Sequence, residues 1–207
     1  MNTVLSLLGA YLIGSVSFGY LAGKLLKGID IREHGSGNAG TTNIQRTVGT
    51  VPAIFVLLLD VGKGVAAVLL AGYLTGQPTV MMLAGVAAIV GHNWPVFFRF
   101  RGGRGIATSI GVLLGLAPVV ILIATAIGVT LIALTRYVSL GSVVGAATIP
   151  ILMLIFTKPP SYILFGAIIG GLAVWRHREN IVRLLNGTEN KLGKKVPVPQ
   201  EEKRVEK

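Results

Sequence analysis

The feature that most restricts how this chain can fold is a series of long, almost uncharged stretches. They run over residues 3–23, 51–75, 79–98, 105–135, 137–157 and 161–175. An α-helix of about 20 apolar residues crosses the hydrocarbon core of a bilayer. Only 13% of the residues are charged, roughly half the share of a soluble domain, and the mean hydropathy is +0.73. The sequence therefore predicts an all-α polytopic membrane protein with one membrane domain, residues 1–190, and a charged tail, residues 191–207.

The fourth stretch decides how many times the chain crosses the membrane. As one helix, residues 105–135 would extend about 46 Å, against a hydrocarbon core of about 30 Å. Gly115 and Pro118 lie near its middle, and proline interrupts helical hydrogen bonding. We predict a break between Gly115 and Pro118, which gives seven transmembrane helices. One long tilted helix would give six.

The positions of the basic residues favour seven helices over six. With seven helices and the N-terminus outside, the cytoplasmic side receives every Lys and Arg except Lys63 and Lys158. Six helices would place Arg136 and the basic C-terminal region on the other side. Basic loops of membrane proteins gather on the cytoplasmic side, where anionic lipid also attracts them. The net charge of +11 is thereby explained without a nucleic-acid partner, and the C-terminus is predicted to be cytoplasmic.

The first stretch is expected to be retained as one membrane helix. No basic residue precedes its apolar run, unlike in a secretory signal peptide, and the run is long enough to span the bilayer. Ser15, Gly19 and Gly23 recur every four residues. This spacing predicts one helix face on which a neighbouring helix packs closely.

Residues 34–46 contain the richest polar motif, HGSGNAGTTNIQR. Glycines allow successive backbone N–H groups to face one anion, and hydroxyl and amide side chains beside a fixed cation can complete a phosphate site. A turn between two helices has the same composition, and G-x-G-x-x-G indicates a dinucleotide only within a strand-helix-strand unit. Composition leaves the turn and the phosphate site open. The phosphate site would use Gly35, Ser36, Gly37, Asn38, Gly40, Thr41, Thr42, Asn43 and Arg46.

Residues 92–105 form a second polar segment, HNWPVFFRFRGGRG, at the end of a predicted span. Its aromatic residues and first two arginines are typical of membrane-interface anchors. The glycines around Arg104 differ, because a flexible backbone presents one guanidinium where Gly105 begins the next helix. We interpret Gly102, Gly103, Arg104 and Gly105 as a second anion site.

Residues 176–189 follow the last predicted span and include RHREN. If that helix continues, His177 and Asn180 lie three residues apart on one face. Histidine titrates near neutral pH, so His177 is a candidate base or donor, whereas His34 and His92 are interpreted as structural. Seven spans put all three polar segments on the cytoplasmic face, where they can share one site.

Asp60 and Lys63 are charged residues inside the second stretch and lie one helical turn apart. A charge in lipid is costly unless it is paired. We interpret the two residues as a structural ion pair or as support for the loop that precedes them. The sequence leaves both interpretations open.

The residue types indicate phosphate chemistry without a metal or another cofactor. The lack of Cys excludes thiolate catalysis, disulfides and Cys-ligated metal. Magnesium-dependent phosphotransfer normally uses clustered carboxylates, and Glu33, Glu179 and Glu189 form no convincing cluster in the sequence. Two alternatives come from other classes: a transporter or channel for a phosphorylated metabolite, and a metal-dependent alcohol phosphotransferase of lipid synthesis.

Four segments resemble the motifs of the bacterial acyl-phosphate:glycerol-3-phosphate acyltransferases, the PlsY family: GSGNAGTTNIQR, GHNWPVFFRFRGGRGIAT, HREN with its following GTE, and LDVGKG. The resemblance implies seven spans with the N-terminus outside, in the bacterial cytoplasmic membrane. It also implies transfer of a fatty acyl group from acyl phosphate to the 1-hydroxyl of glycerol 3-phosphate, giving lysophosphatidate and phosphate. A soluble enzyme that supplies acyl phosphate is the partner expected from the family.

The resemblance also assigns roles to residues that match the family's motifs. It implies that Arg104 stands where the family often has Lys, which replaces a point charge by a planar fork. We hypothesise that the first segment grips the acyl phosphate while Arg104 and Asn180 hold glycerol phosphate, with His177 or a donor phosphate oxygen as the base. The resemblance further implies activity roles for Ser36, Arg46, His177 and Asn180, a glycerol phosphate site shaped by Gly102, Gly103 and Gly105, and a structural role for Glu189.

Overall fold

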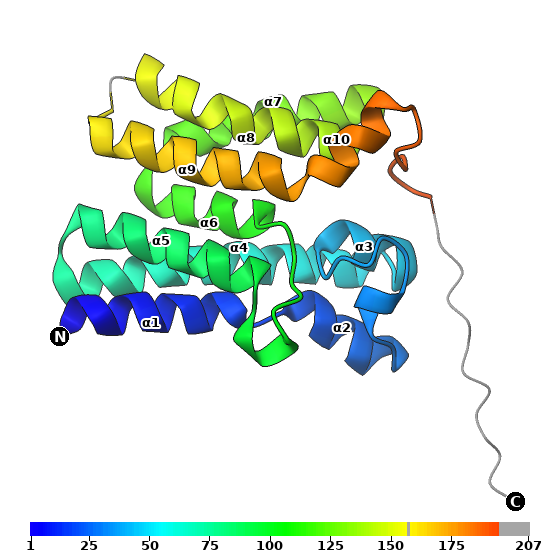
Figure 1. The fold of residues 1–207 in the computed structure, drawn as a ribbon, viewed down its shortest axis with the longest axis horizontal. Helices are drawn as coiled ribbons and strands as arrows, with labels where there is room; N and C mark the ends of the chain where they lie inside the picture. Colours follow the sequence, from blue (N-terminus) through cyan, green and yellow to red (C-terminus); the bar gives the residue numbers. More distant parts are fainter. Residues whose placement is uncertain (157, 195–207) are drawn as a thin grey trace, which may run out of the picture.

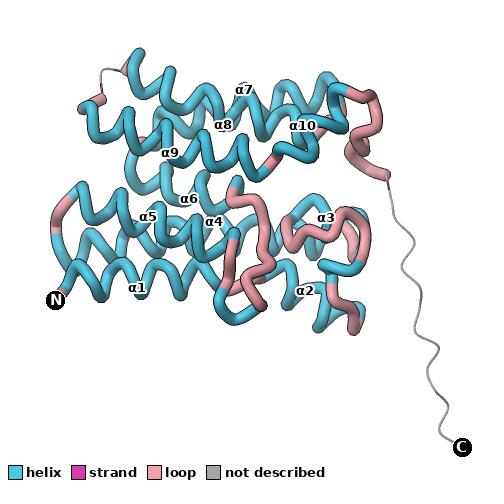
Figure 2. Tube along the Cα trace, viewed as in Figure 1, coloured by secondary structure: helices cyan, strands magenta, loops and turns pink. Residues whose placement is uncertain are grey.

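The computed structural model describes residues 1–156 and 158–194, and this part of the chain consists of helices joined by loops (Figure 2). Residues 157 and 195–207, which include most of the predicted tail, lie outside the described residues. Two short 3₁₀ turns, η1 (Ile31–Glu33) and η2 (Val96–Phe98), lie in loops. The α-helices are α1 (Asn2–Ser15), α2 (Phe18–Lys27), α3 (Thr41–Thr47), α4 (Thr50–Thr75), α5 (Pro78–Asn93), α6 (Ile106–Leu116), α7 (Pro118–Thr135), α8 (Val138–Ile155), α9 (Pro160–Arg176) and α10 (Arg178–Leu185).

The helices form two layers with α6 between them (Figure 1). One layer contains α1 to α5, and the other contains α7 to α10. Buried apolar residues of α4, α5 and α6 pack with those of α7, α8 and α9 in one core cluster, including Val68, Ile89, Leu113, Val120 and Met153. The chain is therefore one helical bundle in which α6 joins the two layers.

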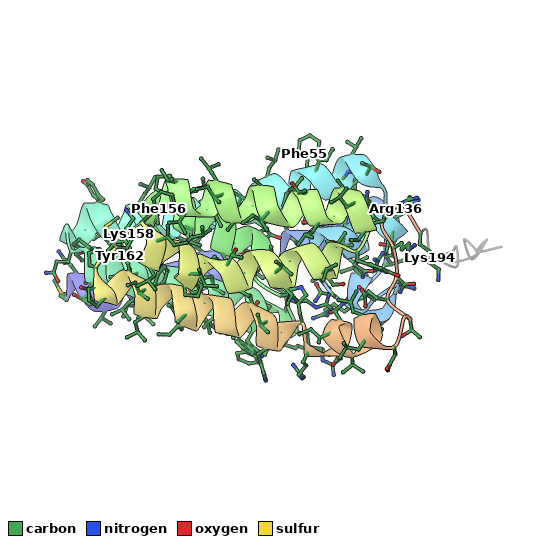
Figure 3. All side chains as sticks on the ribbon, turned by 90° about the horizontal axis from the view of Figure 1, so that it is seen from above. Phe55, Arg136, Phe156, Lys158, Tyr162 and Lys194 are labelled. Carbon is green, nitrogen blue, oxygen red and sulfur yellow. The ribbon has the colours of Figure 1, made fainter. Side chains whose placement is uncertain are left out.

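The lengths and surfaces of the helices are those of an integral membrane protein. Within the described residues, five helical segments are long and apolar enough to cross a membrane: Asn2–Lys27, Thr50–Thr75, Pro78–Phe98, Pro118–Thr135 and Val138–Ile155. The helices α6 and α9 are also apolar but shorter. Large apolar side chains such as Phe55, Leu122 and Leu154 are exposed, and Figure 3 shows Phe55 on the outside of the bundle. Lipid is the solvent that suits such a surface.

The predicted break in the fourth apolar stretch is confirmed. The first helix of that stretch, α6, ends at Leu116, and α7 begins at Pro118, with Ala117 between them. Proline is well suited to the first turn of a helix because its missing N–H has no partner there. By length, α6 extends only about 17 Å, whereas α4 extends about 39 Å.

The prediction of one continuous first helix is wrong. The helix α1 ends at Ser15, and α2 starts at Phe18 after an interruption at Val16 and Ser17. Ser17 caps α2 by accepting a hydrogen bond from the Tyr20 N–H at 3.4 Å. The Lys63 ammonium donates to the Val16 carbonyl at 2.7 Å. A broken helix is tolerated in a membrane protein when another group satisfies the freed backbone, which Lys63 does here.

The interruption also corrects the predicted row of small residues on one helix. Ser15 ends α1, whereas Gly19 and Gly23 belong to α2. A Cβ at Gly19 would collide with the carbonyl of Ala39, and one at Gly23 would lie 3.1 Å from the Ile31 side chain. The two glycines therefore pack against the loop that follows α2.

Arg136 and Lys158 lie at opposite ends of the bundle (Figure 3). They flank α8, and Arg136 is joined to the segment after α10, because it hydrogen bonds with the backbone of Leu192 through both its carbonyl and its guanidinium. Side-chain nitrogens gather at the end that carries Arg136 and Lys194 (Figure 3). This end of the bundle is called the polar end below.

Candidate active site

The three polar segments meet in one pocket at the polar end. Its volume is about 320 Å³. The first segment contributes Ser36, Gly37 and Asn38, the second contributes Phe100, Arg101, Gly102 and Arg104, and the third contributes Arg176, Arg178 and Glu179. Arg32, which precedes the first segment, also lines the pocket. Segments more than 60 residues apart in sequence thus form a single cavity, which we call the arginine pocket.

The charge of the arginine pocket is strongly positive. Arginines outnumber the one lining carboxylate, that of Glu179. Burial lowers the pKa of Arg104 to about 10, and the positive charges of Arg183 and Arg176 act in the same direction. Arg104 is still protonated at neutral pH. An anion that binds beside it would offset the repulsion from the neighbouring arginines. The pocket is therefore suited to phosphate groups.

The first loop is organised by the side chain of Asn43, which is buried at the start of α3. Its Oδ1 accepts from the Ser36 N–H at 2.9 Å. Its Nδ2 donates to the carbonyls of Ile31 at 3.0 Å and His34 at 2.9 Å. Gly35 has φ +63°, and a Cβ there would collide with Asn43 Oδ1. The amide of Asn43 thus holds the loop together, and its hydrogen bonds are directed to the loop backbone.

The loop uses several of the backbone N–H groups that the glycine spacing had assigned to an anion. The Ser36 N–H goes to Asn43, the Gly37 N–H to the His34 carbonyl, and the Gly40 N–H to Asn38 Oδ1. The predicted N–H cradle is therefore wrong for these three groups. Thr41 and Thr42 form the first turn of α3 and, like Gly35 and Gly40, are not among the lining residues. The loop lines the pocket with Ser36, Gly37 and Asn38.

The second segment is shaped by contact with His92. The Gly103 N–H donates to the His92 carbonyl at 3.0 Å. A Cβ at Gly102 would collide with that carbonyl, and one at Gly103 would collide with the His92 ring. Gly105 has φ +86° and precedes α6. These glycines allow the chain to fold tightly over His92 and to present Arg104 to the pocket.

The last span does not continue as one helix through the third segment. The helix α9 ends at Arg176, and α10 starts at Arg178, with His177 at the junction. His177 and Asn180 are both buried, and His177 Nδ1 lies 2.8 Å from the Ala173 carbonyl. Because a carbonyl only accepts, this contact assigns the ring proton to Nδ1 and leaves Nε2 as an acceptor.

Glu189 links Asn180 to the chain after α10. Its two oxygens accept from Asn180 Nδ2 at 2.9 Å and from Arg183 Nε at 2.8 Å. Arg46, half-buried on α3, donates to the Asn190 carbonyl at 3.1 Å. Arg46, His177 and Asn180 therefore lie with the third segment and are not among the residues that line the arginine pocket.

Several lining residues were not singled out from the sequence. Arg32 pairs with Asp30 at 2.6 Å and donates to the Phe98 carbonyl at 2.6 Å, which joins the first loop to the second. Arg176 donates to the Gly103 carbonyl at 2.7 Å and lies over the Trp94 ring. Their positions next to the motifs were a signal, but arginine beside aromatic residues at a helix end is also typical of an interface anchor.

An apolar groove lies next to the arginine pocket, between α6, α7, α8 and α9. Its volume is about 100 Å³. Glycines line the groove where α7 and α8 approach each other closely. A Cβ at Gly128 would lie 2.9 Å from the Gly141 carbonyl. Ile106 and Ser109 line it on α6, and Ala173 lines it on α9.

Within residues 1–156 and 158–194, no group of three or more His, Cys, Asp or Glu side chains is close enough to hold a metal ion.

The fold and the two cavities define an integral membrane protein with an arginine-lined pocket and an apolar groove. The family profile described as glycerol-3-phosphate acyltransferase matches residues 4–187. The chain belongs to this family of integral membrane acyltransferases of phospholipid synthesis.

Curated relatives and solved structures agree with this assignment. The glycerol-3-phosphate acyltransferase of Thermoanaerobacter sp. (strain X514) is 52% identical over 96% of this chain and 100% of its own. That of Halalkalibacterium halodurans is 50% identical over 92% and 96%. The crystal structure of PlsY, an integral membrane glycerol 3-phosphate acyltransferase, in its glycerol 3-phosphate form has a TM-score of 0.88 and 37% identity, covering 93% of this chain and 96% of that one. Its lysophosphatidic acid form has a TM-score of 0.86 and 36% identity, covering 94% and 97%.

Proposed function

We propose that the protein transfers a fatty acyl group from acyl phosphate to the 1-hydroxyl of glycerol 3-phosphate, giving lysophosphatidate and inorganic phosphate. The observation that carries this proposal is that the arginine pocket and the apolar groove adjoin on two separate helices. At the start of α6, Arg104 lines the pocket and Ile106, two residues later, lines the groove. On α9, Ala173 lines the groove and Arg176, three residues later, lines the pocket. A ligand with a phosphate head and an acyl chain fits across that junction.

The reaction requires two phosphate groups in one site. Each carries about −1.5 to −2 charges, so their repulsion is large unless cations lie between and around them. The arginines of the pocket supply those cations. In the transfer, the hydroxyl oxygen of glycerol phosphate attacks the acyl carbon, the bond from that carbon to the phosphate oxygen breaks, and phosphate leaves. Since the donor is already activated, no covalent acyl-enzyme is needed.

We assign the gripping of the donor phosphate to Ser36 and its neighbouring loop, and the holding of glycerol phosphate to Arg104. Ser36 is exposed in the pocket and Arg104 lines the same cavity. Asn180 has a buried Oδ1 without a hydrogen-bond partner in the described part of the chain, so it can accept a substrate hydroxyl after a small movement. Arg46 joins the site when the Asn190 carbonyl releases it.

The donor phosphate is a better candidate for the base than His177. Burial lowers the pKa of His177 to about 4, and the charges of Arg104 and Arg176 act in the same direction. A phosphate ester has its second pKa at about 6, and although the acyl group lowers this value in the donor, we take the donor phosphate oxygen to be a stronger base than His177. We therefore give His177 the role of an acceptor that orients the hydroxyl through Nε2.

A transport reading has less support from the structure. The deep charges Asp60 and Lys63 pair with each other at 2.8 Å, and the groove is apolar, so neither offers a polar path for a phosphorylated metabolite across the bundle.

The proposed setting is the bacterial cytoplasmic membrane, with seven spans, the N-terminus outside and the polar end in the cytoplasm. It is supported by the end of the bundle to which each basic residue belongs. Arg136 lies with the polar segments, and Lys158 lies at the other end (Figure 3). This is the distribution that the positive-inside rule predicts for seven spans. In the cytoplasm a soluble enzyme would supply acyl phosphate.

The test is a reconstitution with purified protein in lipid vesicles. We expect phosphate release and lysophosphatidate formation only when palmitoyl phosphate and glycerol 3-phosphate are both present, with activity retained in a metal chelator. Palmitoyl-CoA in place of palmitoyl phosphate is the control donor. Product from the thioester but not from the acyl phosphate would contradict the proposed donor, and uptake of glycerol 3-phosphate without product would favour a transporter.

The role of His177 makes a prediction about pH. With its pKa at about 4, His177 stays neutral above about pH 5, so its titration cannot change the rate between pH 6 and pH 8. Protonation of the donor phosphate should lower kcat as the pH falls below about 6. We expect His177→Gln to lower kcat by about tenfold while keeping the same acid limb. Measurement of kcat from pH 5 to pH 9 checks this, and an acid limb that disappears in the variant would make His177 the base.

A further inference from the structure

A buried polar cluster links three membrane helices below the arginine pocket. Asp60 Oδ1 on α4 lies 2.8 Å from Lys63 Nζ and 3.5 Å from His92 Nδ1 on α5. Lys63 also donates to the carbonyl of Val16, between α1 and α2. The side chains of Asp60, Lys63 and His92 are 7% exposed or less. Burying these charges is costly. An ion pair whose only role was mutual neutralisation could consist of Asp60 and Lys63 alone, without the contacts to Val16 and His92.

His92 connects this cluster to the second segment of the site. Its ring faces Asp60 through Nδ1, while Gly103 packs on the ring at Nε2. Its carbonyl accepts from the Gly103 N–H, and the Gly103 carbonyl in turn accepts from Arg176. The conformation of Gly102 and Gly103 is therefore set against His92. Arg104, the next residue, lines the pocket.

We propose that His92, oriented by the Asp60 carboxylate, is a positioning residue that sets the substrate affinity of the arginine pocket. This proposal rests on the proposed function, and it extends that function from the residues of the pocket to a residue outside it. A His92 ring that turned or shifted would move the support of Gly103 and Arg104, and displacement of a binding group by about 1 Å can change a rate constant by about 10²-fold. His92 Nδ1 is buried and has no hydrogen-bond partner within the described residues, so the Asp60 carboxylate at 3.5 Å acts on the ring through its charge.

Two substitutions at His92 separate positioning from bulk stability. His92→Leu keeps a side chain of similar width but removes the Nδ1–H, whereas His92→Asn keeps an N–H donor at about the position of Nδ1. We expect His92→Leu to raise KM for glycerol 3-phosphate by about tenfold or more, and His92→Asn to keep KM within about threefold of the original protein. Because KM does not depend on the fraction of molecules that fold, a purely structural role would lower the apparent kcat and leave KM unchanged.

A double substitution tests the part played by Asp60. Asp60→Asn with Lys63→Met removes both charges together, so no unpaired ion is left in the bundle. We expect KM for glycerol 3-phosphate to rise as in His92→Leu. The control is Ser6→Ala, which removes a fully buried polar side chain of α1 at the end of the bundle remote from the pocket, and which should leave KM unchanged.

The measurements are KM and kcat with palmitoyl phosphate at saturation, and the unfolding midpoint in detergent. Unchanged KM in both His92→Leu and the double variant would overturn the proposal, whatever happens to kcat and the midpoint. A KM in His92→Asn as high as in His92→Leu would also overturn it, because the link to Asp60 would then be irrelevant. The unsubstituted protein is assayed alongside, so absence of turnover there would count against the proposed function instead.

Discussion

Replacing Arg104 by Gln is expected to lower kcat/KM for glycerol 3-phosphate by about 10²- to 10³-fold, the usual effect of removing one charged donor that stabilises a reacting anion. Arg104 lines the pocket and is buried enough that its pKa falls to about 10. Its charge is thus poorly solvated and gains most from an anionic partner. We expect the larger part of the loss in KM if Arg104 holds glycerol phosphate in the ground state, and in kcat if it acts mainly on the transition state.

Two further variants test whether the loss is specific to the guanidinium group of Arg104. Arg104→Lys keeps the charge but loses the planar fork, and we expect it to retain activity within about tenfold of the original. Arg99→Gln removes a charge from the same segment at an exposed residue that does not line the pocket, and it should leave kcat/KM unchanged. Equal losses for Arg99→Gln and Arg104→Gln would mean that the general positive field, and not one guanidinium, binds the substrate.

Gly102→Ala is expected to reduce kcat/KM by about 10²-fold or more, although it adds only a methyl group. The new Cβ would collide with the His92 carbonyl and lie 2.7 Å from Pro95 Cδ. Backbone atoms cannot move aside as the end of a flexible side chain can, so the loop must shift and carry Arg104 with it. Steady-state kinetics with both substrates varied would measure the effect.

Gly171→Ala is the matched control for this substitution. Gly171 lies on α9, and a Cβ there meets no atom within 4 Å. Alanine is also the better helix former by roughly 1 kcal/mol, so the variant should be fully active and at least as stable. Wild-type kinetics for Gly102→Ala would show that the loop adapts, and would remove the steric argument for glycine at that position.

The helical framework was largely predictable because membrane helices follow simple rules of length and charge. The break before Pro118 followed from a stretch too long for the bilayer and a residue that cannot continue a helix. The break at Val16 and Ser17 was missed because no proline marks it. Its cause is tertiary, since Lys63 on another helix satisfies the Val16 carbonyl. Pairwise contacts of this kind leave no periodic signal in a sequence.

The candidate site was predictable in its location and less so in its chemistry. The three polar segments were expected to converge, and the arginine pocket contains residues from all of them. The glycine spacing of the first loop suggested N–H groups directed at an anion. In the structure the Asn43 amide takes up the Ser36 N–H, because a buried polar side chain must find partners and the nearest ones are in its own loop. Spacing alone cannot tell which groups will pair internally.

Arg32 and Arg176 line the pocket, and neither was singled out from the sequence as a site residue. Each reaches a backbone carbonyl of the second segment, Arg32 at Phe98 and Arg176 at Gly103. These contacts depend on how α2, α5 and α9 are placed relative to one another, which the hydropathy pattern does not specify.

The shortness of α6 has a consequence for how two substrates of opposite character meet. A helix of about 17 Å beside one of about 39 Å leaves room above its first turn, and the arginine pocket occupies that room. In the proposed reaction, the lipid-borne donor would then not have to lift its tail out of the hydrocarbon. The small hydrophilic acceptor would instead enter a recess lined by guanidinium groups, and the newly esterified product would form beside the apolar groove.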